Sequence, residues 1–326
     1  MEIFVGFEWW HYLLLFAVGL LSGTISPTFG IGGGLLNVPI LLLGFPVLLE
    51  TFVSATGDLS LTVGDVATVT SLGVIFVTAL SGSFSYIREK RIDFRIAITF
   101  MIFAIPGAVS GALFSSLFIK KQNVEIDLYQ IIFAITMILI ATYKIIMIMI
   151  SWVKKRRGVP AKEVIINKEE IEVSQKERPW WLHTVLYRNI EDKRGTNFEY
   201  KAKLLPGVLI ATIGGFIGSL LGLGGGVIYV PILTMGLGLP AAIATATSTF
   251  TILFATPFGL GLRLILGSYI HWGIVICMAT GTLITANIVP KFVHKIKSEV
   301  ILTGFWFIAI AAAIRVLLKV LTDLSI

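Results

Sequence analysis

Long apolar stretches follow one another closely along this chain, and they decide the solvent in which it folds. Of its 326 residues, 56% are hydrophobic and only 14% are charged, and the mean hydropathy is +0.90. Soluble domains carry about 25% charged residues, and about 20 apolar residues cross a bilayer as a helix. Eight long apolar stretches therefore predict membrane helices, at about 9–28, 63–87, 95–119, 127–152, 204–221, 241–266, 272–292 and 299–321.

A glycine-rich motif occurs twice among these stretches. Residues 30–41 read GIGGGLLNVPIL and residues 222–233 read GLGGGVIYVPIL, with eight of twelve positions identical. The apolar segments that follow, 34–48 and 226–238, are short for a full span. We expect each to be a half-helix or a re-entrant segment. A repeated break of this kind is typical of transporters whose substrate site lies where the repeats meet.

The similarity continues downstream, where VATVTSLGVIFVTALSG (66–82) resembles ATATSTFTILFATPFG (244–259). The offset between the copies is 192 residues at the glycine motif and 177 here, so the first half holds about 15 extra residues, within 44–65. The similarity predicts an all-α polytopic membrane protein with about 8–10 membrane segments. It divides into a first repeat (1–152), a charged linker loop (153–203) and a second repeat (204–326).

The distribution of charge predicts how the halves are inserted. The stretch from Lys154 to Lys203 holds 13 of the 26 Lys and Arg residues and 8 of the 19 Asp and Glu residues, a net charge of +5. Clustered basic residues beside a span mark the cytoplasmic side. If all five apolar segments of the first half cross the membrane, the number of crossings is odd and the second half is inserted in the opposite orientation. The basic clusters would then all lie on the same side of the membrane. These clusters are Arg88 to Arg95, Lys154 to Arg157 and Lys291 to Lys297. We therefore expect inverted repeats in the plasma membrane, with loop 153–203 cytoplasmic.

The glycines predict a binding site. Consecutive glycines destabilise a helix and permit positive φ, so each motif should break the chain and then start a short helix. Free N–H groups and the positive end of the helix dipole favour an anion there. Asn37 and Tyr229 differ between the copies, and an asymmetric polar pair suits selectivity. The expected substrate-binding residues are Gly32, Gly33, Gly34, Asn37, Pro39, Thr70, Ser71, Gly224, Gly225, Gly226, Tyr229, Pro231, Thr247 and Ser248.

Structural explanations compete with this prediction. Glycines and small hydroxylated residues also allow tight packing of membrane helices. Asp65 begins an apolar stretch and is expected to be a helix cap, and Arg263 lies near a segment end, from which it can reach the interface.

The paired GxGGGxxxVPxL motifs, the duplicated halves and the central basic loop resemble the TauE/SafE family of sulfite and organosulfonate exporters. The resemblance covers nearly the whole chain. It implies a plasma-membrane permease for small sulfur-containing or organic anions, such as sulfite, thiosulfate, sulfonates or carboxylates. It does not choose among them, and the extra residues around Glu50 and Asp58 are atypical.

Other function classes are less consistent with the residues. Catalytic pairs of His, Glu or Asp inside the spans, HExxH and GxSxG are all absent from the sequence, so we expect no enzyme, cofactor or metal site. The basic loop fits membrane topology better than nucleic-acid binding. The expected partners are a small anion and the lipid bilayer, and a homodimer stays open. Export by alternating access is favoured, with ion-coupled uptake through the same fold or an anion channel as alternatives.

Overall fold

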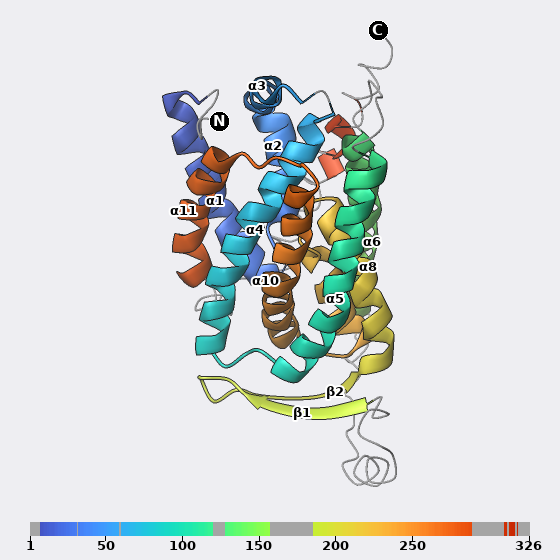
Figure 1. Cartoon of the computed structure of the whole chain (residues 1–326). Helices are drawn as coiled ribbons and strands as arrows, with labels where there is room; N and C mark the ends of the chain where they lie inside the picture. Colours follow the sequence, from blue (N-terminus) through green and yellow to red (C-terminus); the bar gives the residue numbers. More distant parts are fainter. Residues whose placement is uncertain are drawn as a thin grey trace.

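The structure is a computed structural model that describes residues 7–30, 32–58, 60–119, 128–156 and 185–288, with 310–311, 313–316 and 318. These residues form a bundle of helices with a β-hairpin across one end (Figure 1). The expected last span, 299–321, and much of the linker lie outside the described residues. The elements are α1 (Trp9–Phe29), α2 (Gly34–Gly44), α3 (Pro46–Thr56), α4 (Val63–Arg88), α5 (Phe94–Phe114), η1 (Ser115–Ile119), α6 (Leu128–Arg156), β1 (Val185–Glu191), β2 (Asn197–Lys203), α8 (Leu204–Leu220), α9 (Gly226–Pro231), η3 (Ile232–Gly236), α10 (Ala241–Ile265) and α11 (Trp272–Ile288).

Five of the helices are long and apolar enough to cross a membrane, and they lie at Trp9–Phe29, Val63–Arg88, Phe94–Ile119, Tyr129–Met147 and Ala241–Ile265. The pair α2 and α3, bent by 82°, brings the count to six if it is one broken span. The apolar segments Ile210–Leu220, Gly226–Gly236 and Trp272–Ile288 are shorter. The described residues therefore confirm a mostly helical membrane protein, with fewer full-length spans than the expected 8–10 segments.

The extra residues of the first half form α3. Phe45 interrupts the chain after α2, and Pro46 begins α3 at a position where its missing N–H has no helical partner. In the second half, only four residues separate the end of η3 at Gly236 from the start of α10 at Ala241. The insertion predicted within 44–65 is thus an additional short helix beside α2 (Figure 1).

The two sequence halves are interleaved. α1 of the first half packs on α11 of the second, and α8 of the second half packs on α5 of the first. Glycines allow the backbones to touch: a Cβ on Gly19 would collide with the Met278 carbonyl, and one on Gly107 with the Thr212 carbonyl. α4 and α10 then pack against each other in the interior, so α10 contacts both α4 and α5. Any site between α4 and α10 is therefore enclosed by both halves.

The hairpin corrects the all-α prediction. β1 and β2 pair antiparallel from Val185–Lys203 to Glu191–Asn197, and α8 begins directly after β2. Gly195 in the turn has φ +78°. Polar and apolar residues alternate in Asn197–Lys203, which was the available signal for a strand, whereas Val185–Glu191 does not alternate and the linker is highly charged.

Ion pairs attach the hairpin to the loop between α4 and α5. The Arg91 guanidinium lies 2.9 Å from the Asp192 carboxylate, and Arg188 lies 2.9 Å from Asp93. Burial alone would raise the pKa of Asp192, but hydrogen bonds from the Thr196 and Arg194 amides and from Arg91 lower it below its ordinary value. The linker is therefore an ordered connector between the first half and α8 over residues 185–203.

Candidate functional site

Both glycine motifs break the helices in the same way. In each copy a helix ends, three glycines take left-handed backbone angles, and a short helix begins. Residues with a Cβ avoid these angles, so the spacing of the glycines dictates the break. The positive φ values match in pairs: Gly30 (64°) and Gly222 (68°), Gly32 (84°) and Gly224 (72°), and Gly33 (83°) and Gly225 (79°). Gly34 and Gly226 are the buried first residues of α2 and α9.

The two breaks touch each other inside the bundle. A Cβ on Gly34 would lie 2.6 Å from the Leu223 Cα, and one on Gly32 would lie 3.4 Å from the Leu223 carbonyl oxygen. Ile75 of α4 and Ile252 of α10 close the contact on its sides, since both lie within 4 Å of a Cβ placed on either Gly32 or Gly224. The structure therefore brings the two glycine motifs, which are offset by 192 residues, into contact.

One serine fastens each break to a helix of the other half. The Ser71 hydroxyl of α4 donates to the Gly222 carbonyl at 2.8 Å, and the Ser248 hydroxyl of α10 donates to the Gly30 carbonyl at 2.9 Å. Both serines are fully buried. Their protons are engaged with backbone, so these hydroxyls hold the breaks in place in this conformation.

The neighbouring threonines make a second matched pair of contacts. Thr70 accepts the His271 N–H at 3.1 Å, just before α11, and Thr247 accepts the Asp93 N–H at 3.3 Å, just before α5. Each threonine thereby satisfies a backbone donor at the start of a helix. Thr70 and Thr247, like Ser71 and Ser248, connect the two halves.

The two prolines of the motifs lie in different surroundings. Pro39 is buried inside α2, which continues for five residues beyond it. Pro231 ends α9, where the chain changes to the π-helical turn η3, and it lines an outer apolar groove with Leu139 of α6. Pro39 therefore stays near the breaks, whereas Pro231 faces away from them.

Asn37 and Tyr229 are buried polar residues in the first turns of the two short helices. Both are fully buried, and neither the Asn37 amide nor the Tyr229 hydroxyl has a hydrogen-bond partner among the described residues. A Cβ on Gly33 would lie 3.5 Å from Asn37 Nδ2 and 2.8 Å from the unpartnered Ser22 hydroxyl. Each break therefore has unsatisfied polar groups beside it, which is costly in an apolar interior.

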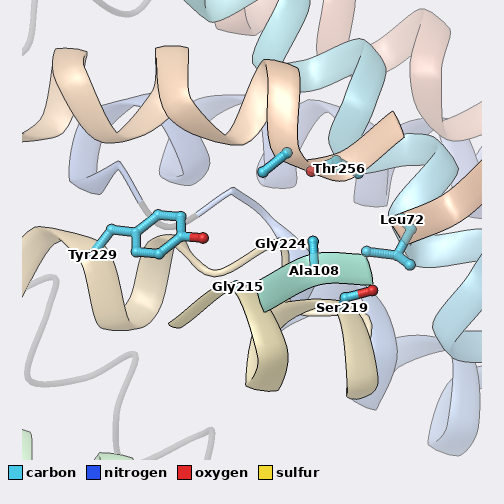
Figure 2. Close-up of a pocket in the computed structure, with 8 residues that line it drawn as sticks. Leu72, Ala108, Gly215, Ser219, Gly224, Tyr229 and Thr256 are labelled. Carbon is cyan, nitrogen blue, oxygen red and sulfur yellow. The ribbon is translucent and has the colours of Figure 1, made fainter. Parts of the chain in front are cut away.

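A small cavity lies at the second break (Figure 2). It measures about 10 Å³, room for about one water molecule. The hydroxyl residues in its wall are Ser219, Tyr229 and Thr256, and none of these hydroxyls has a partner among the described residues. Gly224 and Leu72 also line it. Hydroxyls without partners can donate hydrogen bonds to an anion or bind water.

Sequence reasoning identified Tyr229 and Gly224 but not Ser219 or Thr256. Ser219 lies three residues before the second glycine motif, and Thr256 lies about two turns after Ser248 on α10. Polar residues at these places in apolar helices were the signal that could have identified them.

The expectations for Asp65 and Arg263 were wrong. Arg263 does not reach the interface: its side chain and that of Asp65 are fully buried and form an ion pair. The cap of α4 is instead the Thr62 hydroxyl, which accepts the Asp65 N–H. The partners lie 198 positions apart in the chain, which explains why the sequence pattern did not predict the pair.

Comparisons with known proteins agree with this architecture. The chain matches the family described as "Sulfite exporter TauE/SafE" over residues 15–316. It is 28% identical over 290 residues to the "Probable membrane transporter protein YunE" of Bacillus subtilis (strain 168), covering 89% of this chain and 91% of that protein. It is 27% identical over 222 residues to the "Probable membrane transporter protein MJ0441" of Methanocaldococcus jannaschii, covering 68% and 61% respectively. No solved structure matches the chain. The chain therefore belongs to the TauE/SafE family, and it is a multi-pass membrane transporter and not an enzyme.

Proposed function

We propose that this chain is a secondary permease that exports small sulfur-containing or organic anions of the sulfite, thiosulfate and sulfonate class by alternating access. The family match supports the transporter class and the description of its substrates. The observation that carries the proposal is the group of buried polar side chains without partners beside the two breaks. Each such group costs about 1–3 kcal/mol when it is left unpaired, which a bound substrate or water would offset.

The proposed site lies between the breaks, from Asn37 and Ser22 on one side to Tyr229, Ser219 and Thr256 on the other. Its hydroxyl and amide donors suit oxygen atoms of an anion. A cavity of about 10 Å³ is too small for sulfite, so the helices around it must separate to admit substrate. Such a closed state is one of those that alternating access requires.

Inverted repeats, formed by residues 1–152 and 204–326, would explain how the helices move to open the site. Two related halves that pack against each other are expected to make matched contacts in both directions. The hydrogen bonds of Ser71 and Ser248, and those of Thr70 and Thr247, are such contacts. In such transporters one repeat or bundle rocks against the other around a fixed site. The basic loop 153–203 then lies in the cytoplasm, and the hairpin marks the cytoplasmic end of the bundle.

The membrane potential favours export. With the cell interior negative, a monoanion gains about 2.3 kcal/mol per 100 mV on leaving, which sustains a gradient of roughly 50-fold. Export thus needs no coupling ion, whereas concentrative uptake would require one.

Anion flux in proteoliposomes under an imposed potential tests the proposal. The panel is sulfite, thiosulfate, sulfoacetate, taurine, acetate and chloride, with protein-free liposomes as the control. Saturable, potential-driven flux of a sulfur or organic anion is the expected result. Flux that requires a proton or sodium gradient would replace export by coupled uptake, non-saturating conductance would indicate a channel, and no flux at all would contradict the proposed substrate class.

A further inference from the structure

The buried ion pair between α4 and α10 has no role in the account so far. Arg263 lies in the last turn of α10 and Asp65 in the first turn of α4, and both side chains are fully buried. Arg263 Nη2 donates to Asp65 Oδ1, and Nη1 donates to the Ser219 carbonyl at 3.3 Å. Charged side chains at membrane depth are costly and point to function.

The residue of the first half that corresponds to Arg263 is uncharged, so the fold does not require a charge at this position. At the offset of 177 residues Arg263 corresponds to Tyr86, and at the offset of 192 residues Ser219 corresponds to Pro27. The Tyr86 hydroxyl donates to the Pro27 carbonyl at 2.5 Å, just as Arg263 donates to the Ser219 carbonyl. A neutral phenol therefore makes the equivalent bond, and the guanidinium in the second half needs another explanation.

The ion pair is linked to the cavity through Ser219. Ser219 accepts a hydrogen bond from Arg263 with its carbonyl, and it is one of the residues that line the cavity. Leu72 of α4 and Thr256 of α10 also line the cavity, about two helical turns from Asp65 and Arg263 respectively. The guanidinium thus contacts one residue of the cavity wall.

Arg263 keeps unused hydrogen-bonding capacity. Its Nε is buried without a hydrogen-bond partner among the described residues, and the centre of the Tyr129 ring lies 5.2 Å from the guanidinium carbon. Asp65 also accepts the Ser268 hydroxyl at 3.2 Å, so one donor stays with the carboxylate if Arg263 turns away. A guanidinium with a donor to spare, beside hydroxyls without partners, suits an oxyanion.

We propose that Arg263 recognises the charged group of the transported anion and that Asp65 is its counter-ion while the site is empty. The inference rests on the proposed anion permease and names the residue that supplies its positive charge. An incoming carboxylate, sulfonate or sulfite exchanges with Asp65 on the guanidinium, and Ser268 retains the released carboxylate. The planar donor array favours oxyanions over chloride, which cannot accept two parallel hydrogen bonds in the same way.

The test measures anion binding and flux in the full-length protein, with binding read as the anion-dependent rise in the unfolding temperature. Arg263→Gln alone would leave Asp65 buried without a counter-ion and is liable to unfold. The double variant Asp65→Asn/Arg263→Gln removes both charges and is the informative protein. We expect it to fold and to lose anion affinity by about tenfold or more. Arg263→Lys should keep the charge, fold, and bind oxyanions more weakly than wild type.

Tyr86→Phe is the matched control, since it removes the equivalent bond to Pro27 without removing a charge. It should leave anion affinity unchanged. A neutral double variant with wild-type affinity and flux would overturn the inference and leave the permease standing, because the pair would then be structural. Wild-type protein without binding or flux for any anion of the panel would overturn the permease and this inference together.

Discussion

The two glycine breaks share a backbone and differ in the side chains around it. Their positive φ values agree within about 12°, and each is held by a serine of the other half. Yet Asn37 of the first half corresponds in sequence to Tyr229 of the second, and Tyr86 corresponds to Arg263. The repeated features are those that shape and fasten the backbone, whereas Asn37, Tyr229 and Arg263, which have no identical counterpart in the other half, are residues proposed to contact the substrate. We infer that the repeated glycines and serines maintain the fold and that the side chains that differ determine which substrate is bound.

The helices that follow the breaks show the same division. α2 is a regular helix of 11 residues that is followed by α3, whereas α9 has six residues and continues into a π-helical turn. The cavity lies at the second break, beside the shorter helix. Irregular helical turns of this kind often occur at functional sites. The second half therefore carries more of the proposed chemistry than the first.

Replacing the first glycine of each break should have the largest effect, and an equal one in the two halves. A Cβ on Gly30 would lie 2.8 Å from the Thr245 Cα, and one on Gly222 would lie 2.7 Å from the Thr68 Cα, both at positive φ. We expect Gly30→Ala and Gly222→Ala each to destabilise the fold by about 2–4 kcal/mol through backbone strain and overpacking. Unfolding temperature and membrane yield measure this.

Gly261→Ala in α10 is the control for that pair, because a Cβ there meets nothing within 4 Å. It should be neutral or slightly stabilising. A large loss at one break and none at the other would contradict the equivalence of the two backbones.

Tyr229→Phe should separate chemistry from structure. The Tyr229 hydroxyl has no partner among the described residues, so removing it costs no internal hydrogen bond. We expect an unchanged unfolding temperature and a fall in anion affinity of about tenfold, the effect of one lost hydrogen bond to a charged ligand. Binding and flux measure it, with Tyr143→Phe on the exposed face of α6 as the control. Wild-type transport in Tyr229→Phe would remove the hydroxyl from the site.

The serine bonds give a smaller and symmetric effect. Ser71→Ala and Ser248→Ala each remove one buried bond to a break and leave a carbonyl unpaired, so each should cost about 1–2 kcal/mol of unfolding free energy. Ser110→Ala, which removes a bond within α5 on an exposed side chain, should cost less. Thermal unfolding of the three variants compares them, and unequal losses for Ser71 and Ser248 would weaken the matched arrangement.

The hairpin should show the smallest effect, a pH dependence at acid pH. Because the folded protein lowers the pKa of Asp192, its contribution to stability is present above the ordinary pKa of an aspartate and is lost as the pH falls through the lowered value. Amide hydrogen exchange at Thr196 should therefore be slower than that of Asp192→Asn at neutral pH and should approach it as the pH falls below the ordinary pKa of an aspartate. Equal exchange in the two proteins at neutral pH would show that the ion pair does not hold the turn.

Local patterns predicted the breaks, and contacts over long distances escaped prediction. Gly32, Gly33, Gly224 and Gly225 require positive φ from their spacing alone, so the position of each short helix followed from the sequence. The packing of α1 against α11 did not follow from the sequence. Without knowledge of how the halves interleave, the hydrogen-bond partners of Ser71 and Ser248 could not be predicted. The Asp65–Arg263 pair depends on the same interleaving. The hairpin was missed because seven-residue strands in a charged linker give a weak pattern.

Flux in Gly33→Val and Gly225→Val, compared with Gly261→Val, tests most directly whether the breaks form the substrate site. A side chain on Gly33 would press on Ser22, and one on Gly225 on the Tyr229 ring, so both would intrude among the proposed ligands. We predict that both variants insert into the membrane and lose saturable, potential-driven anion flux, whereas Gly261→Val retains it. Undiminished flux in both Gly33→Val and Gly225→Val would contradict the assignment of the site to the breaks.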